Sequence, residues 1–163
     1  WGDGLVALAS GDAPAAVERF ERAIEVDGTG VGHYELGWAL AAAGDAAGAL
    51  GAFEAALARG RGALAEEFGL ASTVAAFQAL AGDPEGAEAR LAALDAERES
   101  SFALGLAHAA LGRHDRAFEL WLGPTEWTLL QPAHFRYGAL PPGVREDPRY
   151  DRVLARIDDL WGW

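Results

Sequence analysis

The residues able to do chemistry are few and lie far apart along the chain. Its histidines are His33, His108, His114 and His134, and pairs of adjacent acids stand at 66–67 and 158–159. Imidazoles and carboxylates hold a metal or move protons only where the fold brings several of them together. His108 and His114 straddle a break between two expected helices, so they share no metal-binding face. We therefore expect structural or surface roles for the histidines and solvated positions for the acidic pairs.

Nucleotide chemistry lacks the residues it requires. P-loop and protein-kinase sites place a Lys on the phosphates, and kinases add an Asn on magnesium; the chain contains neither Lys nor Asn. GTGVGH at 28–33 begins like a dinucleotide loop, but His33 stands where the last Gly belongs and no strand precedes it. We expect no catalytic residue, no cofactor and no metal. An enzyme with an unrecognised acidic site is the alternative.

Composition narrows the class of partner. The net charge is −12 and every basic residue is Arg, a balance that repels phosphate backbones and anionic lipid. The chain has no Cys, hence no disulfide, thiolate zinc site or thiol nucleophile. It has no apolar run long enough to span a bilayer. We expect a protein or peptide partner, with no nucleic acid and no membrane insertion by this segment.

The first residue is Trp1 and the chain has no Met, so we expect a segment of a longer protein. No signal peptide is visible. A cytoplasmic location is favoured, with a membrane-anchored parent protein left open.

A repeat dominates the first three-quarters of the sequence. Four glycines each close one helical pattern and precede another, at spacings of 33, 38 and 30 residues: Gly11, Gly44, Gly82 and Gly112. Five positions after each stands Ala, and nine positions after stands a large residue, namely Phe20, Phe53, Leu91 and Trp121. Leu-Gly pairs recur before the turn at 36–37 and 104–105, with Val-Ala at 74–75. Such self-similarity is typical of stacked helical hairpins.

Small residues on this register let paired helices approach closely. We expect the Gly or Ala before each turn to face the Ala after it, with the large residue filling the hairpin's open end. The turn Gly supplies a left-handed C′ position. Asp12, Asp45 and Asp83 then cap the second helix of their hairpins, and Pro84 suits the first helical position. Gly37→Leu should overpack the second hairpin.

The pattern resembles the tetratricopeptide repeat (TPR), a helix-turn-helix unit of about 34 residues. Residues 33–58 carry it best, and residues 101–121 nearly as well. The resemblance implies an all-α fold: a right-handed superhelical stack of about four hairpins with a C-terminal capping helix. We divide the chain into a repeat array at 1–122, with units near 1–28, 30–62, 64–98 and 99–122. A Pro-broken linker and the capping helix follow at 123–163.

The terminal segment departs from the repeat at Pro124. Asp147 and Pro148 begin a last helix, whose apolar stripe is Tyr150, Val153, Leu154, Ile157, Leu160 and Trp161. We expect the stripe to seal the last hairpin, as solenoid ends require; an interface for another subunit is the alternative. DPRYDRVLARI also resembles the end of repeat modules in bacterial signalling proteins such as Ser/Thr kinases, adenylate cyclases and membrane-bound transcription regulators.

In TPR-like arrays the first helix of each hairpin lines a concave groove. Projecting the register outward gives candidate partner-binding residues Tyr34, Trp38, Ser72, Ala76, Phe102 and Leu106. Concave aromatics anchor peptides by burying large areas. The alternative is that Trp38 and Phe102 pack between hairpins or under the C-terminal helix. If the groove is open, Trp38→Ala should weaken binding more than stability.

We therefore expect a noncatalytic scaffold that binds a peptide or partner domain on a concave helical surface. Chaperone-tail binding is disfavoured, because clamps for a terminal carboxylate present basic groove residues and none is projected here. A self-association module of a larger bacterial signalling protein, a homo-oligomer formed through Trp161 and Trp163, is the second hypothesis.

Overall fold

The computed structural model describes residues 2–27, 30–60, 66, 68–94, 99–123, 127–128 and 130–161. In these ranges the chain forms helices joined by turns, without a strand. The helices are α1 (Gly2–Ala9), α2 (Ala13–Asp27), α3 (Gly30–Ala42), α4 (Ala46–Arg59), α6 (Leu70–Leu80), α7 (Pro84–Ala92), α8 (Ser101–Ala110), α9 (His114–Leu122), α10 (Gln131–Tyr137) and α11 (Tyr150–Trp161).

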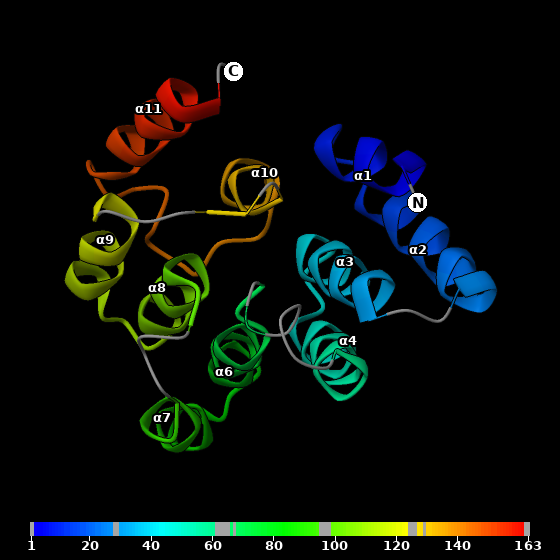
Figure 1. Cartoon of the computed structure of the whole chain (residues 1–163), viewed down its shortest axis with the longest axis horizontal. Helices are drawn as coiled ribbons and strands as arrows, with labels where there is room; N and C mark the ends of the chain where they lie inside the picture. The colour runs from blue at the N-terminus through cyan, green and yellow to red at the C-terminus, as the bar shows by residue number, and fades with distance from the viewer. Residues whose placement is uncertain are drawn as a thin grey trace.

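The first eight of these helices pair into antiparallel hairpins that stack side by side. The pairs are α1–α2, α3–α4, α6–α7 and α8–α9, and successive hairpins meet where α2 packs on α3, α4 on α6 and α6 on α8. Figure 1 shows the hairpins along an arc, with α1, α3, α6 and α8 on its inner side. The expected all-α hairpin stack is confirmed.

The turns follow the expected chemistry. Gly11, Gly44, Gly82 and Gly112 all have positive φ, between 74° and 103°, and end the first helix of their hairpins. The Asp45 carboxylate accepts the Gly48 N–H at 2.8 Å, and Asp83 accepts that of Gly86 at 2.9 Å. These caps satisfy backbone donors that a helix start leaves free. The fourth hairpin has Arg113 at this place, which makes no side-chain cap.

Close approach within the first, second and fourth hairpins depends on a glycine beneath a ring. A Cβ added to Gly37 would lie 2.7 Å from the Phe53 ring, and one added to Gly4 would lie 2.7 Å from the ring of Phe20. Gly105 stands in the same relation to Trp121. In each of these pairs the ring lies directly on the glycine that stands sixteen positions before it in the sequence. The ring can occupy this place because the glycine has no Cβ.

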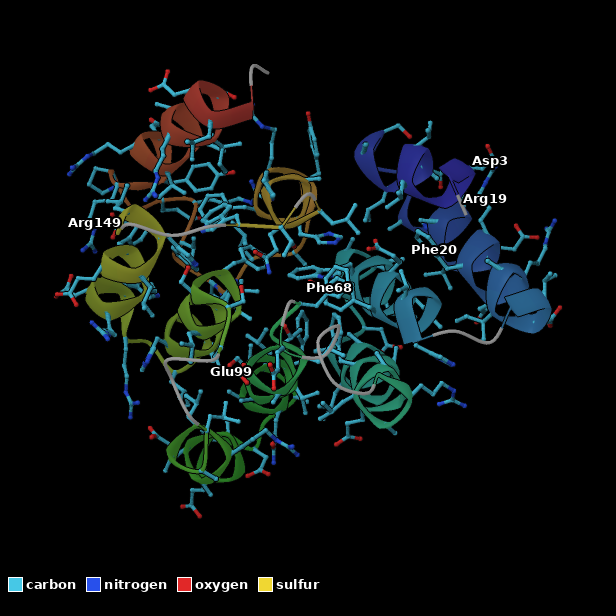
Figure 2. All side chains as sticks on the ribbon, viewed as in Figure 1. Asp3, Arg19, Phe20, Phe68, Glu99 and Arg149 are labelled. Carbon is cyan, nitrogen blue, oxygen red and sulfur yellow. The ribbon has the colours of Figure 1, made fainter. Side chains whose placement is uncertain are left out.

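The C-terminal helix caps the stack on α9. Val153 and Ile157 are buried, whereas Leu160 is 62% exposed, so the expected stripe ends before its last turn. Arg149 holds the start of α11: its guanidinium lies 4.5 Å from the Phe118 ring of α9 and pairs with Asp115 at 2.9 Å (Figure 2). Trp161, the last residue of the expected apolar stripe, has a side chain outside the described ones, so its packing is not described. Of the described helices, none has both the length and the apolarity needed to cross a bilayer.

Candidate functional site

The six candidate groove residues are all buried. None of Tyr34, Trp38, Ser72, Ala76, Phe102 and Leu106 is more than 1% exposed. Part of this burial comes from α10, which lies inside the arc (Figure 1) and contacts Tyr34 and Trp38 through His134. In this structure the six side chains are therefore not open to solvent. Partner binding at these positions stays a prediction. Of the alternatives weighed, the structure has Trp38 and Phe102 packed between hairpins and under the C-terminal segment.

One side of α10 packs on α3 through His134. Its imidazole stacks on the Trp38 indole, with ring centroids 4.6 Å apart and planes 8° from parallel. Tyr34 meets the same imidazole edge-on at 5.5 Å. Phe68, from the segment between α4 and α6, closes the cluster at 5.0 Å from Tyr34 (Figure 2). Rings from α3, α10 and this loop therefore surround one small volume.

The other side of α10 packs through Phe135. This ring is fully buried, 5.1 Å from Trp121, 5.5 Å from Trp127 and 5.3 Å from Tyr150. Trp127 in turn lies 5.5 Å from Phe102. Adjacent residues of α10 thus point to opposite walls, His134 to α3 and Phe135 to α9, α11 and the Trp127 ring. The helix spans the groove.

The six candidate residues do not all contact the same part of the chain. Tyr34 and Trp38 contact α10, and Phe102 contacts Trp127. The Ser72 hydroxyl instead donates to Glu99 at 2.5 Å, toward the segment that leads into α8. Ala76 and Leu106 belong to the buried apolar cluster between hairpins. The groove surface in contact with the C-terminal segment is therefore centred on α3 and the start of α8.

A carboxylate lies at the centre of this contact. Glu35 is 0% exposed, and its Oε1 is 3.3 Å from Nε2 of His134, itself 2% exposed. Neither Glu35 oxygen has a hydrogen bond of standard geometry with a described residue. The same holds for the Tyr34 hydroxyl and the Trp38 indole N–H, which lie close to each other. Burial, with the neighbouring Glu35 charge, raises the pKa of Tyr34 above its ordinary value. Four polar groups therefore meet in a buried, aromatic volume with little hydrogen bonding.

Sequence analysis missed Glu35 and treated His134 as a structural or surface residue. A signal did exist, since Glu35 is the only charged residue between His33 and Asp45. It lies between Tyr34 and Trp38, the two groove candidates of that helix, on a turn otherwise made of Leu, Gly and Ala. A lone acid on the inner face of an apolar helix is expensive to bury, and such a position deserves scrutiny as a binding residue.

Polar contacts hold both ends of α10. At its start, Gln131 donates to the Ser100 hydroxyl at 2.8 Å and accepts the Thr128 N–H at 3.0 Å. After its end, Arg145 donates to the Gly138 carbonyl at 2.8 Å. Arg136, on the outer side, pairs with Asp158 of α11. These contacts fix the ends of the segment and leave its centre to the rings and to Glu35.

An apolar cavity of about 250 Å³ opens between α1 and α10. Its lining residues are Leu5, Val6, Leu8, Ala9, Leu130, Ala133, His134 and Tyr137. Val6 is 69% exposed and Tyr137 45% exposed, so apolar surface continues outside it. On this side α10 is only lightly covered by the first hairpin.

The remaining candidates for chemistry stay apart. Among the described residues, no group of three His, Cys, Asp or Glu side chains gathers as metal ligands. Asp158 is paired with Arg136, Asp159 and Glu66 are exposed, and Glu67 lies outside the described residues. Burial, and after it the positive charges of Arg113 and Arg116, lower the pKa of His108.

Comparison with protein-family models gave no match. Comparison with curated proteins likewise gave no match.

Proposed function

We propose that this chain is a noncatalytic, tetratricopeptide-like scaffold that binds a helical segment of a partner protein on the concave side of its hairpin stack. One observation carries the proposal: that side already holds a helix, α10, through ring contacts and the approach of His134 to Glu35. The turn glycines, the Asp caps and the glycine-on-ring contacts supply a rigid frame for such a groove.

The contacts of α10 indicate how a partner would be held. Large aromatic side chains in desolvated pockets contribute most of the binding energy in protein interfaces. Here Phe135 enters a pocket of three rings and His134 stacks on a fourth. A partner helix with an aromatic anchor can use the same pocket after replacing α10. Because α10 is only seven residues long and lies outside the four hairpins, we expect the hairpins to stay folded when it is released.

The test uses α10 itself as the probe. In the chain carrying Phe135→Glu, called the opened chain, a buried carboxylate without a partner replaces the anchor and expels α10. A fluorescein-labelled peptide of residues 130–140, LQPAHFRYGAL, is then titrated against it and followed by anisotropy. We expect saturable binding at least about tenfold tighter than to the unaltered chain, a difference of about 1.4 kcal/mol.

Two matched controls sharpen the result. Tyr137→Glu introduces the same charge on α10 at a half-exposed position, so it should leave the groove closed and the peptide unbound. A peptide with Ala at the Phe135 position should not bind the opened chain. If the opened chain keeps its helical circular dichroism but binds no peptide, the concave side is only a packing surface and the proposal fails.

Self-association is the second candidate function. The exposed Val6 and Tyr137 beside the α1–α10 cavity, and Leu160 at the end of α11, are apolar surface that a second copy could cover. The side chains first expected there, Trp161 and Trp163, lie outside the described residues. Light scattering between about 1 and 100 times a working concentration separates the two candidates, because a concentration-independent monomer contradicts self-association.

A further inference from the structure

Glu35 is the residue that the fold of the hairpins does not explain. It lies on α3 with no exposed surface, and neither of its oxygens accepts a hydrogen bond from a described residue. Around it stand the Tyr34 hydroxyl of its own helix and the His134 imidazole of α10. Burying a carboxylate in this way costs several kcal/mol unless a cation compensates it. The groove therefore holds an anionic position for which α10 supplies only an imidazole.

The fit between His134 and this position is incomplete. Nε2 of the imidazole reaches Oε1 at 3.3 Å and leaves Oε2 without a partner. The pair carries compensating charge only when the imidazole is protonated. Arg136, the nearest permanent cation on α10, points to Asp158 on the opposite side. A side chain with a permanent charge and more donors would satisfy Glu35 better.

We infer that the groove selects a partner helix in which an Arg or Lys precedes an aromatic residue, the cation lying between the Trp38 ring and the Glu35 carboxylate and the aromatic residue in the pocket of Phe135. This inference rests on the proposed function. His134 and Phe135 of α10 occupy the same two places, as a weaker version of that pair.

The chemistry of the site favours a guanidinium. A guanidinium can stack on the Trp38 indole, where the His134 imidazole now lies with its ring centroid 4.6 Å away. Cation–π attraction is strongest with Trp. Its forked donors can engage both oxygens of Glu35 at once, which an imidazole cannot. The net charge of −12 also attracts a basic segment and repels an acidic one during encounter.

The test compares peptides that differ at one position. Four versions of the 130–140 peptide carry His, Arg, Gln or Glu at the His134 position, with blocked termini, and are titrated against the opened chain at pH 7.5 in 0.15 M salt. We expect the Arg peptide to bind at least about tenfold more tightly than the Gln peptide, with the Glu peptide weakest. In the opened chain that also carries Glu35→Gln, the Arg and Gln peptides should bind alike.

The outcomes separate this inference from the proposed function. If no peptide with Phe binds, the proposed function fails. If all four bind equally, the function stands and the selection of a cation is overturned. If the Arg preference survives Glu35→Gln, general attraction to the acidic chain explains it, and the inference is again overturned. Should Phe135→Glu prevent folding, Phe135→Ala gives a milder opened chain for the same four titrations.

Discussion

The hairpin interiors and the groove are both packed with rings, but they differ in how their polar groups are treated. Inside the fourth hairpin, Trp121 lies on Gly105 and its indole N–H donates to the Phe102 carbonyl at 3.1 Å. In the groove, Trp38 is equally buried, yet its indole N–H makes no hydrogen bond of standard geometry with a described residue, and the same holds for the Glu35 oxygens.

This difference suggests that the packing inside the hairpins is fixed, whereas α10 in the groove can be replaced by another helix. A buried polar group that lacks a hydrogen bond costs about 1–3 kcal/mol, and at the contact of α10 with α3 several such groups lie together, a carboxylate among them. On the hairpin helices α6 and α8 the unsatisfied atoms are neutral side chains, such as those of Thr73 and Ser101. The groove can gain hydrogen bonds from an occupant that satisfies Glu35, and for this reason we place partner binding there.

The largest effect is expected from Trp38→Ala. Trp38 contacts Phe53, Phe77 and Phe102 as well as the two rings Tyr34 and His134. Truncating a fully buried Trp costs about 3–5 kcal/mol through lost burial and the cavity left behind. The sequence-based expectation that binding would suffer more than stability is thus replaced. Urea unfolding measures the loss; Trp127→Ala, at a half-buried ring, serves as the control and should cost clearly less.

A loss of about 3 kcal/mol is expected from Gly37→Leu. Even a Cβ at this position would lie 2.7 Å from the Phe53 ring, so four added carbons force the α3–α4 hairpin apart. Overpacking usually costs 1–3 kcal/mol, and this site leaves no room to relax. Thermal melting is the measurement. Gly51→Leu is the matched control: nothing lies within 4 Å of a Cβ there, so the better helix former should raise the midpoint. Equal melting of both variants would contradict the glycine-on-ring contact.

The repeat could be predicted from sequence because each of its features is local. A Gly that must adopt positive φ, an Asp that caps the next turn and a small residue sixteen positions before a ring all act within one hairpin. Four copies of the same pattern also confirm one another. The inward direction of Tyr34 and Trp38 followed from the same register.

The filled groove could not be predicted in this way. Whether α10 lies in the groove depends on contacts between His134 and Trp38, about a hundred residues apart. The segment before α10 carries Pro and aromatics without a helical period, which indicated only a break in the array. Its docking follows from Phe135, which contacts rings of α9 and α11, and from Gln131, which bonds Ser100 just before α8. These partners come together only when the stack is assembled.

A smaller effect is expected when the same substitution is made in the groove and in the fourth hairpin. Trp38→Phe and Trp121→Phe remove the same atoms from fully buried sites. Trp121→Phe also removes the hydrogen bond from the indole to the Phe102 carbonyl. We therefore expect the Trp121→Phe variant to lose about 1 kcal/mol more stability than the Trp38→Phe variant. Urea unfolding of the two variants under the same conditions measures this difference. Equal losses would mean that the indole N–H of Trp38 also has a partner, and that the groove is as well satisfied as the hairpin.

The smallest effect concerns the attachment of the cap, where acid should loosen α11 before it affects the hairpins. The hydrogen bond from the Arg149 guanidinium lowers the pKa of Asp147 from 3.8 to about 2. A carboxyl whose pKa is lower in the folded state stabilises the fold above its unfolded pKa, and this stabilisation is lost as pH falls from about 4 to about 2. Asp147→Asn should therefore differ from the unaltered chain at pH 7 and converge with it near pH 2, in unfolding monitored by circular dichroism. Asp159→Asn removes the same charge from an exposed site on α11 and should show no such convergence. A constant difference for Asp147→Asn across this range would mean that the pair with Arg149 does not hold the cap.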